Sequence, residues 1–173
     1  MGAAASTKVP KQSSPTSPVT LLPTQCLQVP VALERLYLGL GWRNKGGASL
    51  DVDASAVSFS GNQVHNIVYF GSTRDRAAPS AVVHTGDVLT GGKGDVDLER
   101  IYIQCGALAK EVDSVYLVIN VFTGGKTFAD VDAAYCRLVN ADSNQELANF
   151  RLGDLKTGDA IVFGKLSRHP ATG

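Results

Sequence analysis

The residues of this chain that could do chemistry gather in one acidic, glycine-rich stretch, from His84 to Glu99. Its other carboxylates belong to Asp87, Asp95 and Asp97, and glycines lie between and around them. Glycine lets a loop turn tightly and point carbonyl oxygens inward, while the acidic side chains supply negative charge. Calcium takes roughly six to eight oxygens from carboxylates, carbonyls and water. The stretch therefore predicts a calcium-binding loop.

A second acidic pair, Asp51 and Asp53, flanks Val52 at the start of an expected strand. Side chains alternate along a strand, so both carboxylates point to one face. Two carboxylates on one face repel each other unless a cation lies between them. The simpler interpretation is a pair of solvated turn acids. We expect instead that the pair and the loop form one site, assembled from separate loops because no stretch matches the EF-hand pattern.

His84 heads the loop and could be a ligand, an acid–base group or a residue that bonds the loop backbone. Calcium prefers oxygen to imidazole, which favours the backbone role. A hydrolase in which Mg²⁺ or Mn²⁺ activates water would need His84 as its acid–base group. The sequence contains neither a nucleophile elbow nor a phosphate-binding loop. We therefore expect no catalytic residue and no enzyme.

The composition argues against several other classes of protein. Sixteen basic residues balance sixteen acidic ones, which gives no support for nucleic-acid binding. Seven of the acids lie between positions 51 and 99, so a local negative field is expected there. Three widely spaced cysteines argue against a disulfide scaffold or a zinc site, and a reduced, cytoplasmic setting fits them best. No apolar run is long enough for a membrane-spanning helix, and the first twenty residues lack the apolar core of a secretory signal.

Residues 1–28 differ from the rest, because they are rich in proline, serine and threonine. This composition predicts a disordered arm. The arm begins Met1-Gly2-Ala3-Ala4-Ala5-Ser6, which matches the pattern for N-myristoylation at Gly2. One acyl chain binds a bilayer only marginally, so reversible contact with the cytoplasmic face of a membrane is expected.

From residue 29 to residue 173 the periodicity is almost entirely that of strands. About eight to ten short strands, separated by glycine, asparagine and aspartate turns, predict an all-β, two-sheet β-sandwich. One helical turn is expected at 127–133. The expected strands cover residues 35–42, 53–60, 64–70, 101–104, 112–122, 135–139, 147–152 and 160–166.

Several motifs in order resemble the TerD domain of the tellurium-resistance and stress-response proteins. They are Leu40-Gly41-Trp42, Leu50 to Ala56, His84-Thr85-Gly86-Asp87, Leu89-Thr90-Gly91, and Asp97 with Glu99. Val118 to Gly124, Phe128 to Val139 and Gly164 to His169 resemble its second half. The resemblance spans about residues 33–169 and leaves the arm outside.

This resemblance implies a calcium-binding β-sandwich without established catalytic activity, linked to stress. Asp51, Asp53, Asp87, Asp97 and Glu99 match its acidic positions, Thr90 a hydroxyl position and Asn120 a polar position. Val88 and Leu98 stand where the family usually has an asparagine and a second aspartate, with Asp95 available to compensate.

Two further expectations follow from the differences between this chain and the family pattern. If Val88 and Leu98 have silenced the site, the chain is a calcium-independent, membrane-tethered interaction module. The family also usually continues with a tryptophan-containing strand beyond Arg168-His169. A sheet edge left open there would allow self-association or a protein partner.

Overall fold

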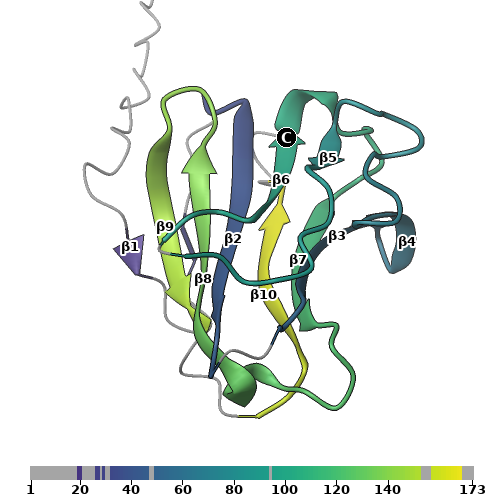
Figure 1. Ribbon diagram of the computed structural model, residues 1–173. Coiled ribbons are helices and arrows are strands. Elements are labelled where there is room, and N and C mark those ends of the chain that lie inside the picture. The colour runs from purple at the N-terminus through teal and green to yellow at the C-terminus, as the bar shows by residue number, and fades with distance from the viewer. Residues whose placement is uncertain are drawn as a thin grey trace, which may run out of the picture.

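The computed structural model describes residues 19–20, 26–27, 29, 32–46, 49–93, 95–152 and 157–168. These residues form two β-sheets packed face to face, with two short 3₁₀ turns between strands (Figure 1). The predicted all-β sandwich is confirmed.

The larger sheet has six strands in the order β1-β9-β8-β2-β6-β5. Its neighbours are antiparallel, except that β1 runs parallel to β9. The strands are β1 (Val19–Thr20), β2 (Arg35–Asn44), β5 (Val82–His84), β6 (Glu99–Gln104), β8 (Val131–Asn140) and β9 (Gln145–Arg151).

The smaller sheet has four antiparallel strands in the order β10-β7-β3-β4. They are β3 (Val52–Ser60), β4 (Gln63–Val68), β7 (Ser114–Val121) and β10 (Ala160–Ser167). In β7 every second residue is fully buried, because one face of the sheet covers the core while the other faces outward.

The core lies between the sheets and is built from the inward residues of both. Leu38, Leu40 and Trp42 of β2 pack in one cluster with Leu117 and Ile119 of β7, all at most 2% exposed. A smaller cluster under β9 includes the partly buried Leu27 and Val29. Leu27 lies just before residue 29, where the predicted domain begins, and that boundary stays a prediction.

The eight expected strands all occur, with ends that differ by a few residues. The sequence reading missed β5, which has only three residues, and the 3₁₀ turn η1 (Cys105–Ala107). The expected helical turn shrinks to the 3₁₀ turn η2 (Phe128–Asp130), because Val131 already begins β8.

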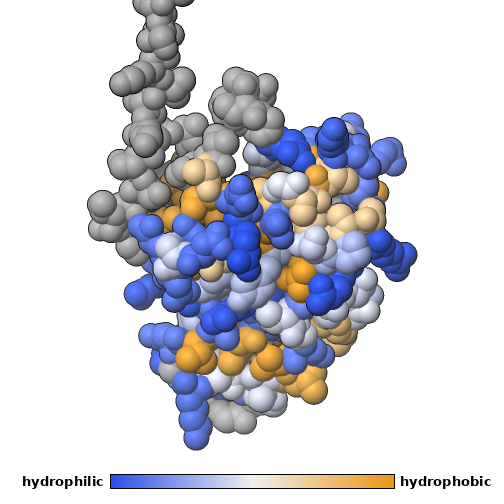
Figure 2. Space-filling model, turned by 90° about the horizontal axis from the view of Figure 1, so that it is seen from above, coloured by the Kyte–Doolittle hydropathy of each residue, from blue (hydrophilic) through white to orange (hydrophobic). Residues whose placement is uncertain are grey.

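The predicted disordered arm falls mostly outside the described residues, and so does Gly2. Two of its residues, Val19 and Thr20, instead pair with Ala148 and Asn149 of β9. No helix among the described segments has the length and hydropathy that crossing a bilayer would require. Viewed from above, the surface is mainly hydrophilic, with smaller apolar patches between the charged groups (Figure 2).

Candidate metal centre

Three aspartates meet at the start of β3. Oxygen atoms of Asp51, Asp53 and Asp87 all lie within 4.8 Å of one another. The alternation that the D-x-D spacing predicted brings the first two together, and the acidic loop after β5 delivers the third. The structure therefore brings Asp51 and Asp53 together with an aspartate of the acidic loop, as the sequence predicted.

The start of β3 has an open edge that makes room for the loop. β7 pairs with β3 from Val52 onward, but β4 pairs with it only from Ala56 onward. The backbone of Asp51 is fixed from the β7 side, because its amide donates to Thr123 Oγ1 at 2.9 Å and its carbonyl accepts from the Phe122 amide at 2.9 Å. The opposite side of this segment is free to face the acidic loop.

Glu99 joins the loop to that open edge. Its side chain is fully buried, and its two carboxylate oxygens accept from different segments. Oε2 accepts from the Ala54 amide at 2.9 Å and Oε1 from the Val88 amide at 3.2 Å. Glu99, predicted as a ligand, thus lies beside the three aspartates and holds Asp53 and Asp87 near each other.

The aspartate cluster lacks the polar partners that buried carboxylates normally have. Asp53 is only 1% exposed, and among the described residues neither of its carboxylate oxygens has a hydrogen-bond partner. Asp51 Oδ1 is buried and unpartnered in the same way. Such orphaned oxygens indicate a missing partner, since an uncompensated buried charge is costly.

The raised pKa values of Asp53 and Asp51 also indicate that the cluster lacks a positive partner. Burial, followed by the negative charges of Asp51, Glu99 and Asp87, raises the pKa of Asp53 to about 7. Burial and the charges of Asp87 and Glu99 also raise the pKa of Asp51. A divalent cation would reverse both effects, because it supplies the positive charge and the contacts that the carboxylates lack.

His84 adopts the backbone role that its position favoured. Its Nδ1 accepts a hydrogen bond from the Gly86 amide at 3.0 Å, so the proton of the neutral ring lies on Nε2. Nε2 is 3.3 Å from Glu99 Oε2, but the geometry does not make a hydrogen bond. The ring is buried and bonds the first turn of the acidic loop.

The remaining loop candidates lie around the cluster rather than in it. Thr90 Oγ1 accepts from Asn44 Nδ2 at 2.8 Å, and Asn44 Oδ1 accepts from the amides of Leu50 and Gly91. Asn44, which the sequence reading missed, therefore ties the acidic loop to the segment before Asp51. Its position at the end of a strand, next to a glycine turn, is the only sequence signal for this role.

Asn120 and Asp95 have different surroundings. Asn120 of β7 is directly opposite Asp53 of β3, so its side chain is on the same sheet face as that carboxylate. Asp95 is exposed, and its charge acts on Tyr135 rather than on the aspartate cluster. Asn120 therefore remains available to the site, whereas Asp95 does not belong to the group of three.

Asp97 requires a correction. The structure places its carboxylate, which is fully buried, between Arg137 of β8 and Arg100 of β6. Arg137 donates from Nε and Nη2, each at 2.8 Å, and Arg100 Nε donates at 3.1 Å. Burial alone would raise the pKa of Asp97, but the two guanidinium groups outweigh it and hold the pKa below its usual range. Asp97 is thus a structural ion-pair residue.

Gly39 of β2 shows how closely that ion pair is packed. A Cβ atom at this position would lie 2.6 Å from the Asp97 carboxylate, so any side chain would displace it. The glycine therefore makes room for Asp97 beneath the two arginines.

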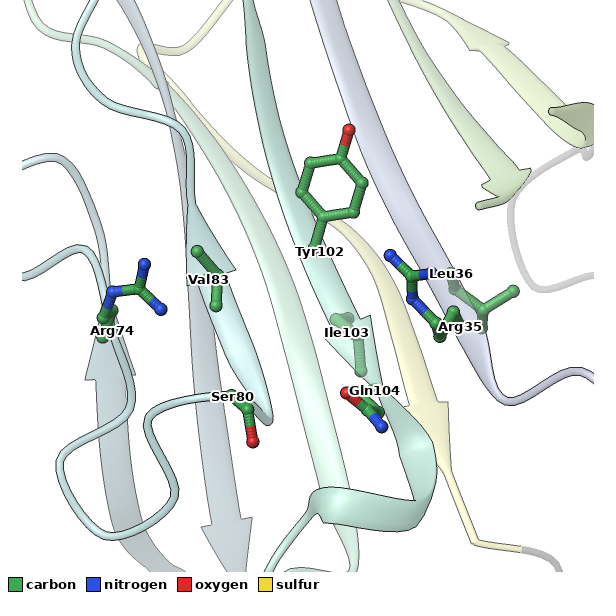
Figure 3. Close-up of a pocket in the computed structure, with 8 residues that line it drawn as sticks. All are labelled: Arg35, Leu36, Arg74, Ser80, Val83, Tyr102, Ile103 and Gln104. Atoms are coloured by element: carbon green, nitrogen blue, oxygen red, sulfur yellow. The ribbon is translucent and has the colours of Figure 1, made fainter. Parts of the chain in front are cut away.

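A shallow cleft lies at the other end of β6, away from Glu99. Figure 3 shows Arg74 and Arg35 on its two sides, with Tyr102 and Gln104 of β6 between them. Its volume is about 300 Å³. Arg35 is already paired with Asp142 at 3.0 Å, and Arg74 donates to the Pro79 carbonyl at 3.3 Å. The cleft has no orphaned buried group, and the aspartate cluster is the stronger candidate site.

The fold and the cluster together define a β-sandwich with three aspartates at the start of β3 that could hold a metal ion. A sequence model of the TerD domain matches residues 24–172. This chain belongs to the TerD-domain family, as the sequence motifs indicated.

Named relatives agree with this assignment. The tellurium resistance protein TerD of Alcaligenes sp. is 33% identical over 148 residues, which cover 80% of this chain and 76% of that protein. General stress protein 16U of Bacillus subtilis is 31% identical over 146 residues, which cover 79% of this chain and 75% of that protein.

A solved structure of a TerD homologue from Streptomyces coelicolor superimposes with a TM-score of 0.67 at 16% identity, covering 82% of this chain and 85% of that chain. At that identity the likeness concerns the fold alone. The same sandwich is therefore present in both chains.

Proposed function

We propose that this chain is a non-enzymatic calcium-binding protein of the stress response, of the tellurite-resistance type. The observation that carries the proposal is Asp53, which is almost fully buried beside two further aspartates and whose two carboxylate oxygens have no hydrogen-bond partner among the described residues. An all-oxygen donor set of three carboxylates suits a hard cation better than a transition metal. Calcium, when bound, would offset two of the three negative charges and tie the acidic loop to β3.

The physiological part of the proposal comes from relatives. Two of them carry the names of a tellurium resistance protein and a general stress protein. Asp51, Asp53 and Asp87 would hold the ion, and Asn120 lies where it could add an oxygen. Glu99 would hold the start of β3 and the acidic loop together through its bonds to the amides of Ala54 and Val88.

The calcium-independent alternative rested on Val88 and Leu98. Both side chains are partly buried against the hydrophobic core. The three aspartates meet without a contribution from either position. This arrangement supports the calcium-binding function, because the two departures from the family pattern leave the cluster intact.

Two further parts concern location and partners. The Met-Gly-Ala-Ala-Ala-Ser start supports acylation at Gly2 and reversible contact with a membrane. β10, the terminal strand of the smaller sheet, pairs only with β7 among the described strands. Its other edge supports pairing with a second chain.

Asp87→Asn is expected to weaken calcium binding by at least tenfold, because it removes one of three ligand charges. Asp95→Asn, in the same loop, is the matched control and is expected to leave the affinity within about twofold. Competition with a chromophoric calcium chelator measures both affinities on the full chain. Equal losses in the two variants would show that the loop acts only through its total charge.

A further inference from the structure

Large apolar side chains are exposed immediately beside the aspartate cluster. Leu89 is 65% exposed, Phe122 is 59% exposed and Tyr69 is 37% exposed. Scattered single apolar residues need no explanation, but several next to one candidate site do.

Phe122 is fixed to the site by its backbone and by its neighbours. Its amide donates to the Asp51 carbonyl, and Asp51 is the residue opposite it when the β3–β7 ladder is extended by one step. Its ring contacts Phe70 at a centroid distance of 5.4 Å, and Phe70 contacts Tyr69 at 5.3 Å. The three rings therefore form one aromatic group on the flank of the acidic residues.

Leu89 belongs to the acidic loop on the other side. It follows Asp87 by two residues, and its carbonyl accepts from Ser49 Oγ at 3.4 Å, two residues before Asp51. The aspartates thus have one exposed apolar side chain on the loop that carries Asp87, and another, Phe122, on the segment that pairs with Asp51.

A bilayer with anionic headgroups matches this arrangement once a cation is bound. Without a cation, the three carboxylates repel anionic lipids. One calcium ion offsets two of the three negative charges and so weakens that repulsion, and headgroup phosphate oxygens can take positions on the ion that three aspartates leave open. Exposed apolar side chains beside the ion can then enter the boundary between headgroups and acyl chains.

The acylation proposed at Gly2 makes a second membrane contact useful. A single acyl chain gives only marginal binding, and stable attachment takes two signals. Only Lys8 and Lys11 follow Gly2 closely, which is a weak polybasic segment. A membrane contact made by the folded domain would supply the missing signal.

We propose that the aspartate end of the sandwich docks on anionic lipid bilayers in a calcium-dependent manner, with Phe122 and Leu89 inserted at the interface. The inference rests on the proposed calcium site. It adds a surface, a partner and a regulation that the calcium site alone does not imply.

The test uses the unacylated full chain, so that the domain's contribution is measured alone. Sedimentation with vesicles of phosphatidylserine and phosphatidylcholine is expected to pull down the protein with calcium and to release it with EGTA. Vesicles of phosphatidylcholine alone are expected to bind at least tenfold more weakly. Phe122→Ser and Leu89→Ser should each weaken vesicle binding about tenfold, since each removes exposed apolar surface that insertion into the bilayer would bury.

Val64→Ser is the matched control, because Val64 is 54% exposed but pairs with Phe59 at the far end of β3. It should leave vesicle binding unchanged, and calcium affinity without vesicles should be the same in all three serine variants. Calcium binding without vesicle binding would overturn the docking and leave the proposed function standing. No calcium binding at all would overturn both. Vesicle binding that ignores calcium, or that survives both loop substitutions, would also overturn the docking.

Discussion

Asp53→Asn is expected to stabilise the calcium-free protein at pH 8 and to abolish the additional stabilisation that calcium provides. Asparagine keeps the size of the side chain and removes a buried charge that has no hydrogen-bond partner in the part of the chain that the structure describes. Its amide can also donate to the neighbouring carboxylates. In the natural chain, calcium at about a hundred times its Kd should add about 2.7 kcal/mol. For a chain of this size that raises Tm by about 5–11 °C.

The pH dependence of this effect follows from the raised pKa. In the folded, metal-free protein the pKa of Asp53 is about 7, whereas an unfolded aspartate titrates near pH 4. The folded state therefore binds the proton more tightly, and stability is lost as pH rises from about 4 through about 7. The cost at pH 8 is on the order of 2–4 kcal/mol, so acidification from pH 8 to pH 5 in EGTA should raise Tm.

Thermal melts in EGTA and in calcium, from pH 5 to pH 8, measure both effects. Asp53→Asn should flatten the pH profile in EGTA and show no calcium response. A natural protein whose Tm in EGTA rises between pH 5 and pH 8 would contradict this description of Asp53.

Arg137→Ala is expected to destabilise the domain by about 3 kcal/mol, which lowers Tm by about 6–12 °C. Arg137 bonds both oxygens of the buried Asp97, and its removal leaves that charge with Arg100 and Tyr135 alone. The remaining partners keep the loss at the lower end of the range for a broken buried ion pair. Denaturant unfolding measures the change.

Arg43→Ala is the control for Arg137→Ala. Arg43 is 3.7 Å from Asp132, and both side chains are about half exposed. Its loss should cost less than about 1 kcal/mol. Adding Asp97→Asn to Arg137→Ala should recover part of the stability, since it removes the charge that was left unpaired. Equal effects of the two arginine substitutions would show that Asp97 does not depend on Arg137.

The sequence predicted the local features of the site well. Alternation placed Asp51 and Asp53 on one face of β3 because the period of a strand leaves no other choice. The tight glycine turn that follows His84 allowed Asp87 to reach them. These features depend on a few neighbouring residues, which the sequence displays directly.

The sequence could not show which acidic residues of the loop face the aspartate cluster and which form ion pairs with arginines. Asp97 and Glu99 are two residues apart, yet Asp97 pairs with Arg137 of β8 and Glu99 bonds the start of β3. Arg137 is 40 residues away in the chain and arrives only because β2 lies between β6 and β8. An acidic residue in a glycine-rich loop does not reveal whether its partner is a cation or an arginine. The sequence did not predict β5, because three residues are too few to show the alternation of a strand.

We propose that the three aspartates form a cation site that calcium fills. The most direct test is isothermal titration of calcium into the EGTA-stripped full chain at pH 7.5, with Asp53→Asn titrated alongside. We expect a saturable heat for one or two ions in the natural chain, and the loss of at least one ion in the variant. A flat trace for the natural chain, or identical binding by the variant, would contradict the proposal.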